Sequence, residues 1–394
     1  MLDSFVGLAG KQSWAARIAE IRDRATAGPR SGKAIRQRHA VELAVERMRE
    51  TPGRQPSAAE FLLASHAADA VALAGELSPV GRRRLAEVLQ RAIAGDGTLI
   101  PLFHLLRTAA LQRSRGFTVR FSGLEEGTEF DLLLARERVE AEISCEVMSA
   151  EDGRDVHRGA WFRLADRIDP ELQTWLSAHP GRYLLKMTLP QGLHGGLHAT
   201  EEVPDPLAAL HQRIRTLLQT RMRQDHDEAI VLRLDPLTLS SAQGEDLGLL
   251  PFLRREFGPE AHLAVTTAGG GVFVMAARAA QENGVAVAVR KRLGVTAPDR
   301  LTGTRPGIMA IFLEDTDRLE WRGLRERLEL EGEARQFLTN PEAKRVVAVT
   351  FASRLELFGM KEPDAVEDGE LRFRNPGHPA ARIPALAPAV LSSL

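Results

Sequence analysis

Three glutamates alternate with apolar residues in the stretch from Val139 to Val147. Successive side chains of a β-strand point to opposite faces, so one face of this predicted strand would carry Glu140, Glu142, Ser144 and Glu146. Neighbouring carboxylates repel one another unless solvent, a basic partner or a cation lies close to them. Carboxylate oxygens suit Mg²⁺ or Mn²⁺, which can activate water and neutralise a phosphodiester transition state. The alternative interpretation is that these glutamates form the polar half of a solvent-facing strand.

A further carboxylate belongs to the preceding predicted strand, which runs from about Glu129 to Ala135. The charged turn Arg136-Glu137-Arg138 follows this strand, so the two strands are expected to form a hairpin. Asp131 could then project toward the acidic face of its neighbour. We therefore expect Asp131, Glu142 and Glu146 to ligate Mg²⁺ or Mn²⁺, with Ser144 lining the same site.

Strands and helices alternate around this hairpin. Apolar residues at helical spacing predict one helix from Leu102 to Gln112 and another that begins near His157, and period-two patterns predict strands over 117–121 and 183–189. A further helix begins at Asp205-Pro206, and a buried strand covers 229–232. Such alternation predicts an α/β fold with a mixed sheet flanked by helices.

The sequence pattern divides the chain into three predicted parts. Residues 1–97 are rich in Ala, Arg, Glu and Leu at helical spacing and predict an all-helical N-terminal region, and residues 98–236 hold the α/β core. Residues 237–394 form a C-terminal α/β segment that could extend the same sheet. It includes a hairpin around Gly269-Gly270-Gly271, strands over 308–313 and 345–351, and one charged helix from about Asp317 to Phe337 between those two strands.

The order of helix, strand, Asp131, acidic strand and helix near His157 resembles the core of PD-(D/E)XK nucleases. The segment Ser149–Arg158 also resembles the loop and helix start that follow the acidic motif in bacterial members. This resemblance implies a restriction-endonuclease-like fold and a Mg²⁺-dependent phosphodiesterase acting on DNA or RNA. It also implies that Asp131 and the acid of the E-X-K motif bind the metal, while the lysine helps to activate water.

The sequence departs from this pattern at the lysine. The E-X-K motif falls either on Ser144-Cys145-Glu146 or on Glu142-Ile143-Ser144, and neither contains a lysine. Lys186, on the next predicted strand, is a candidate replacement, and a surface lysine is the alternative. The sequence therefore leaves two functions open, a metal-dependent nuclease or a non-catalytic nuclease-fold protein acting as a binding, regulatory or assembly factor.

Candidate nucleic-acid contacts cluster before the helix that begins near His157. Arg154, His157 and Arg158 lie where backbone N–H groups at a helix N-terminus favour phosphate. Two histidines further along the chain, His194 and His198, have a spacing known from zinc ligands. The glycines between them disfavour a helix and no H-E-x-x-H acid accompanies them, so a loop is predicted there.

Composition limits the classes of partner. Lys+Arg number 52 and Asp+Glu 53, so the chain as a whole has no electrostatic attraction to DNA or to an anionic membrane, and nucleic acid would need a local patch. The single cysteine, Cys145, excludes an intrachain disulfide. No apolar run reaches about 18 residues and no export signal is visible at the N-terminus, so a cytoplasmic protein without a membrane partner is expected. A protein partner or a homo-oligomer is compatible with this composition.

Overall fold

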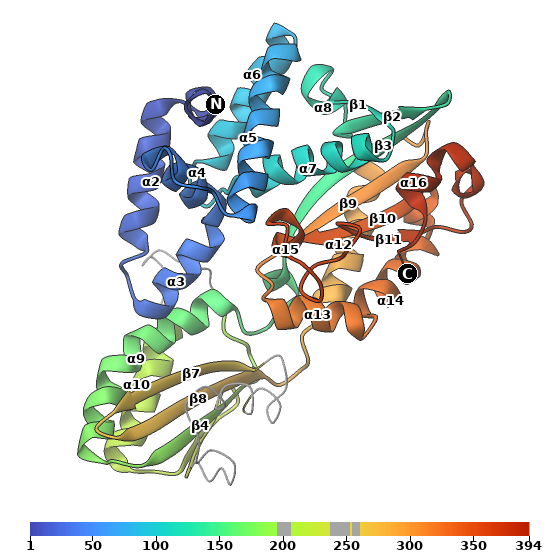
Figure 1. Ribbon diagram of the computed structural model, residues 1–394. Coiled ribbons are helices and arrows are strands. Elements are labelled where there is room, and N and C mark those ends of the chain that lie inside the picture. Colours follow the sequence, from blue (N-terminus) through green and yellow to red (C-terminus); the bar gives the residue numbers. More distant parts are fainter. Residues whose placement is uncertain (195–205, 237–252, 254–260, 394) are drawn as a thin grey trace. The chain divides into compact units, whose positions relative to one another are not determined.

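The fold is taken from a computed structural model that describes residues 1–194, 206–236, 253 and 261–393. The chain divides into two units, each made of separate stretches of sequence (Figure 1). Unit 1 consists of Met1–Arg22, Arg38–Asp152 and Val285–Leu394, and unit 2 consists of Asp23–Gln37 and Gly153–Gly284. Unit 2 is therefore formed by a short N-terminal segment and one long insertion into unit 1.

A mixed sheet runs through unit 1. Its strands, in spatial order, are β1 (Thr118–Arg120), β2 (Leu132–Arg136), β3 (Val139–Ser149), β9 (Gly307–Glu314), β10 (Val346–Ser353) and β11 (Leu371–Arg374). The first three form an antiparallel meander, β3, β9 and β10 are mutually parallel, and β11 is antiparallel to β10. Every residue of β9 and β10 is buried, as expected for parallel strands covered on both faces.

Helices cover both faces of this sheet, which gives unit 1 three layers. One face packs against α7 (Ile100–Ser114) and the N-terminal helices, through a core that includes Phe103, Ile143 and Phe312. The other face packs against α12 to α14, through a core that includes Met309, Trp321 and Phe351. Each fully buried large apolar side chain stabilises the fold by roughly 1.5–3 kcal/mol relative to exposure.

The predicted helical N-terminal region contains α1 (Leu2–Ala9), α2 (Lys11–Arg24), α3 (Pro29–Arg38), α4 (Ala40–Glu50), α5 (Ala58–Glu76) and α6 (Pro79–Ala92). Of these, α3 belongs to unit 2 except for Arg38. Besides α7, the other helices of unit 1 are α8 (Ser122–Glu125), α12 (Val285–Arg300), α13 (Arg318–Glu326), α14 (Glu329–Leu338), α15 (Arg354–Leu357) and α16 (Ala387–Val390). None of the helices in the described part of the chain combines the length and the apolar character that crossing a membrane requires.

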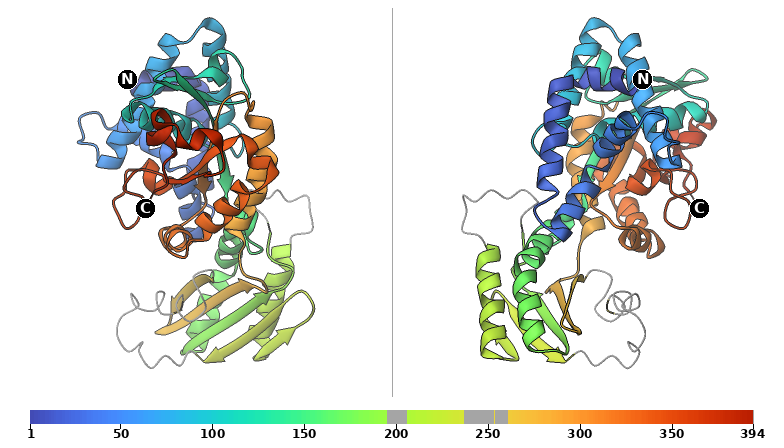
Figure 2. Two further views of the ribbon diagram at one scale, coloured as in Figure 1. Left: turned by 90° about the vertical axis from the view of Figure 1, so that its right-hand side faces the viewer. Right: turned by 60° about the vertical axis from the view of Figure 1, so that its left-hand side comes forward.

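Unit 2 has its own mixed sheet. Its strands, in spatial order, are β5 (Gln224–His226), β6 (Val231–Pro236), β4 (Arg182–Leu189), β8 (Gly271–Ala279) and β7 (His262–Ala268). The helices α9 (Arg158–Ala178) and α10 (Pro206–Thr220) lie side by side on one face of this sheet (Figure 2). The β7–β8 hairpin turns at Gly269 and Gly270, both with positive φ, as the glycine run predicts.

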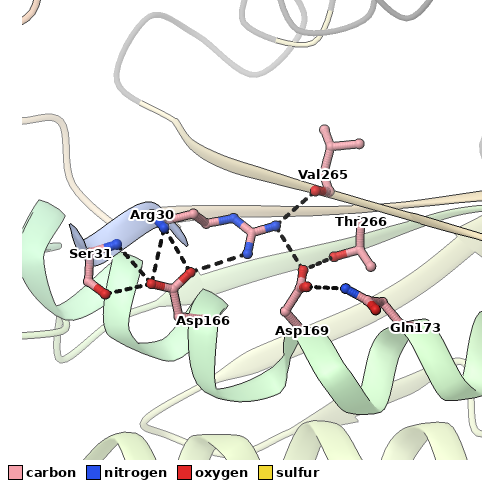
Figure 3. A network of polar contacts seen from close by, with 7 residues as sticks. All are labelled: Arg30, Ser31, Asp166, Asp169, Gln173, Val265 and Thr266. Atoms are coloured by element: carbon pink, nitrogen blue, oxygen red, sulfur yellow. Dashed lines mark hydrogen bonds and ion pairs between the residues drawn. The ribbon is translucent and has the colours of Figure 1, made fainter. Parts of the chain in front are cut away.

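The N-terminal segment of unit 2 is held by polar contacts at the start of α3 (Figure 3). The carboxylate of Asp166 on α9 accepts hydrogen bonds from the backbone N–H groups of Arg30 (3.1 Å) and Ser31 (2.8 Å). The Arg30 guanidinium donates to Asp169 (2.9 Å) and to the carbonyl of Val265 (2.8 Å). Asp166 thus acts as an N-terminal cap for α3, although it lies 135 residues after Ser31 in the sequence.

The observed boundaries differ from the predicted ones. The predicted core over 98–236 contains strands of both sheets, because β4 pairs with β6 and β8 rather than with β3, and β6 pairs with β4 and β5. The neighbour of β3 is β9, from the C-terminal segment. That segment is itself divided, since β9 to β11 join the sheet of unit 1 while β7 and β8 belong to unit 2.

Two elements near the C-terminus also differ from expectation. The charged helix predicted from Asp317 to Phe337 is two helices, α13 and α14, because Leu328 adopts a left-handed conformation with φ of 59°. The helix α12, with Pro298 inside it, and the strand β11 were not predicted. Valines and a proline weaken the helical pattern of the first, and only four residues form the second.

Candidate functional site

The hairpin of β2 and β3 places Asp131 next to the acidic strand. Leu132 pairs with Ile143, and the backbone N–H of Asp131 donates to the carbonyl of Ile143 (2.9 Å). The Asp131 carboxylate accepts a hydrogen bond from the backbone N–H of Cys145 (2.8 Å). This carboxylate therefore lies beside the middle of β3, as the alternation of side chains predicts.

The two faces of β3 meet different layers of unit 1. Ala141 and Ile143 are buried in the core beneath α7. The opposite face, with Glu142, Ser144 and Glu146, is covered by the end of α12 and the loop that follows it. The acidic face is consequently not a freely solvated strand surface.

One guanidinium group connects the acidic side chains. Arg300, the last residue of α12, donates through Nη2 to Asp131 (2.8 Å) and through Nε to Glu146 (2.8 Å). The same Nε lies 3.2 Å from the hydroxyl of Ser144. These charge-assisted hydrogen bonds hold Asp131 and Glu146 on a single basic group.

The environment of these groups changes their proton affinities. Burial raises the pKa of the Asp131 carboxyl, although Arg300 acts in the opposite direction. Burial alone would lower the pKa of Arg300, but the charges of Asp131 and Glu146 outweigh it and the pKa is raised. Arg300 is therefore the cation that relieves the repulsion expected between carboxylates on this face.

The other two glutamates of the strand are also paired. Glu142 is fully buried, and its carboxylate accepts from the backbone N–H (2.9 Å) and the hydroxyl (2.5 Å) of Thr302. Arg305 donates to Glu140 (2.7 Å) and lies 3.7 Å from a carboxylate oxygen of Glu142. The loop after α12 thus supplies hydrogen-bond donors to both glutamates.

The structure brings Asp131, Glu142, Ser144 and Glu146 together on unit 1, and it adds Arg300, Thr302 and Arg305, which sequence reasoning missed. The remaining predicted site residues belong to unit 2. Lys186 lies on β4 and forms an ion pair with Asp235 (3.4 Å). Arg154 precedes α9, His157 is its N-cap residue and Arg158 is its first residue.

The carboxylates of this face do not converge as the divalent cation implied by the resemblance would require. A divalent cation needs several oxygen ligands directed at one point. Here Asp131 and Glu146 accept from Arg300, while both oxygens of Glu142 accept from Thr302. Among the residues that the structure describes, no three or more His, Cys, Asp or Glu side chains are grouped to hold a metal ion. This arrangement does not fit Mg²⁺ or Mn²⁺.

A second polar cluster lies at the carboxyl ends of the parallel strands of unit 1. Asp315, which follows β9, accepts from Ser149 at the end of β3 (2.6 Å) and pairs with Arg38 (3.4 Å). Its neighbour Glu314 accepts from Thr98 (3.4 Å). The carboxyl ends of parallel strands are where α/β proteins commonly bind ligands. This cluster is therefore a candidate binding site that the sequence patterns did not reveal.

Charge and burial combine strongly at Glu314. Burial and the nearby Asp315 raise the pKa of the Glu314 carboxyl to about 7, although Arg38 and Arg354 act against the rise. Burial lowers the pKa of Arg354, while Glu314 and Asp315 oppose this. Glu314 therefore changes charge close to neutral pH.

The start of α4 and its N-cap residue contribute two further buried polar groups. Glu42 is fully buried and accepts from the backbone N–H of Leu99 (2.9 Å). His39, also fully buried, lies with Nδ1 3.6 Å from the same carboxylate.

Comparison with known proteins gives no match, whether to a family model, to a curated protein or to a solved structure.

Proposed function

We propose that this chain is a nuclease-fold protein that acts by binding or assembly, with Arg300 in the place of the divalent cation of a nuclease. The observation that carries the proposal is the bridge from one guanidinium to Asp131 and Glu146, at 2.8 Å each. These are two of the three residues that the sequence pattern selects as metal ligands. A basic side chain of the protein itself now neutralises them.

The order of elements in unit 1 supports the nuclease-like part of this proposal. The helix α7 is followed by the antiparallel strands β1 to β3, and α12 then leads to β9, which is parallel to β3. The resemblance to PD-(D/E)XK nucleases implies a helix, a meander carrying the acids, and a further helix. The helix near His157 that the resemblance assigned to this place is α9, which belongs to unit 2. In unit 1 the next helix of more than one turn after the acidic strand is α12, with unit 2 inserted before it.

The charge of Arg300 supports the second part of the proposal, that the protein does not catalyse cleavage. The guanidinium brings one permanent positive charge and several N–H donors in a fixed plane, which matches two carboxylates without a metal. A divalent cation would have to displace Arg300 and leave its charge without these partners. The lysine of the E-X-K motif, which would help to activate water, is replaced by Ser144 or Glu146 in the two alignments of the motif.

A cleavage assay with a matched variant tests the proposal. The protein is incubated with single- and double-stranded DNA and RNA in Mg²⁺, Mn²⁺ or a chelator, beside Asp131→Ala. We expect no metal-dependent cleavage by either protein, and any binding of labelled nucleic acid to be equal with metal and with chelator. Metal-dependent cleavage by the wild type that is lost in Asp131→Ala would overturn the proposal, whereas cleavage that survives in the variant would identify a contaminating nuclease.

A further inference from the structure

Two segments of unit 2 that are distant in sequence lie side by side before α9 and after β4. Val156 and Leu193 form a parallel β-bridge. The N–H of His157 donates to the carbonyl of Leu193 (2.8 Å), and the N–H of Leu193 donates to the carbonyl of Asp155 (2.7 Å). Val156 and Leu193 are buried in the core of the unit, so the backbone on both sides of this bridge is fixed by packing.

The residue after each bridge partner is a histidine. His157 and His194 therefore occupy adjacent positions on the two paired segments. His157 is the N-cap residue of α9, but its side chain makes no capping hydrogen bond to the helix. The two rings lie edge to face, with centroids 4.9 Å apart and planes at 84°.

The ring nitrogens of the pair are directed toward one another. Nε2 of His157 and Nδ1 of His194 are 3.4 Å apart. Two nitrogens bound tetrahedrally to one ion at about 2.0–2.1 Å are separated by about 3.3–3.4 Å. A good hydrogen bond involving nitrogen is shorter, at about 2.9–3.0 Å. The observed separation is long for a hydrogen bond between the two rings and equals the separation expected of two ligands of one metal ion.

We propose that His157 Nε2 and His194 Nδ1 bind one divalent transition-metal ion of the Zn²⁺, Ni²⁺ or Cu²⁺ class. Neutral imidazole suits these ions, whereas Mg²⁺ and Ca²⁺ prefer oxygen ligands. Two protein ligands leave the other coordination positions to water or to a bound molecule, and they give weaker binding than a closed structural site. His198, the second histidine of the spacing noted in the sequence, lies outside the described residues.

Calorimetric titration of untagged, chelator-treated protein with Zn²⁺ alone tests this site. The variants are His157→Gln and His194→Gln, and the control is His226→Gln, an exposed histidine on β5 of the same unit. We expect one site in the wild type and in the control, and affinity at least tenfold weaker in each of the other variants. Since His194 is exposed, its replacement is expected to leave thermal unfolding unchanged.

A spectroscopic readout separates this site from other modes of metal binding. Cu²⁺ bound to the wild type should give an electron paramagnetic resonance spectrum with coupling to two imidazole nitrogens, and His194→Gln should lose one of them. The proposal is wrong if the wild type binds no Zn²⁺ at millimolar concentration. It is equally wrong if His157→Gln and His194→Gln both bind Zn²⁺ as tightly as the wild type does.

Discussion

Glu314→Gln should abolish the decrease in the free energy of unfolding that Glu314 causes in the wild type as pH rises. The carboxyl lies at the end of β9, within the polar cluster of Asp315, Arg38, Arg354 and Glu42. Glutamine keeps an oxygen that can accept from Thr98 but cannot ionise. The variant therefore removes the cost of burying a charge while it preserves the shape of the side chain.

The magnitude follows from the pKa of Glu314. Burial, assisted by Asp315, raises this pKa from 4.5 to about 7. Between these two values the folded state binds more protons than the unfolded state, so the free energy of unfolding falls as pH rises through this window. A rise from 4.5 to about 7 corresponds to about 3 kcal/mol, nearly all of it developed between pH 4 and pH 8.

Urea unfolding followed by circular dichroism at several pH values measures this effect. The free energy of unfolding of Glu314→Gln, minus that of the wild type, should increase by about 3 kcal/mol from pH 4 to pH 8. Glu76→Gln, at an exposed position on α5, controls for the change in net charge. A difference that stays constant with pH, or that decreases as pH rises, would refute the reasoning about Glu314.

Three further substitutions test contacts inside one or the other unit, each by thermal or urea unfolding. Asp166→Ala removes the cap of α3 and should lower stability by about 1–2 kcal/mol, with faster proteolysis of residues 23–37; unchanged proteolysis would contradict the docking of α3. Gly32→Ala would place a methyl group 2.1 Å from the carbonyl of Ala25 and should cost about 1–3 kcal/mol, so a neutral result would exclude this close approach. Glu356→Ala leaves the buried donors of Trp321 and Ser353 and the half-buried N–H of Val366 without their acceptor and should cost about 3 kcal/mol or more; a smaller cost would mean that water replaces the carboxylate.

Local patterns in the sequence predicted much of the hairpin that carries the candidate site. Alternation along 139–147 separated the apolar and acidic faces of β3, and the charged turn before it indicated that Asp131 lies beside that strand. Both signals depend on residues that are close in sequence. The alternation could not indicate what covers the acidic face, because that depends on tertiary packing.

The partner of the acidic face is distant in sequence. Arg300 lies 169 residues after Asp131, at the end of a helix whose valines and Pro298 obscure its pattern.

The assignment of strands to sheets failed for a related reason. Nothing in the residues of β4 shows that it pairs with β8 rather than with β3, since buried strands of either sheet have similar apolar sequences.

Binding of Mn²⁺ to the wild type and to Arg300→Ala tests most directly whether Arg300 stands where a nuclease would hold its metal. Calorimetry and the paramagnetic signal of free Mn²⁺ report the binding. Arg305→Ala is the matched control, because it removes an arginine beside Glu140 and Glu142 and leaves Arg300 on Asp131 and Glu146. We expect no Mn²⁺ binding by the wild type or the control, and one site in Arg300→Ala that disappears in the double variant with Asp131→Asn. Equal binding of Mn²⁺ by the wild type and Arg300→Ala would contradict the proposed role of Arg300.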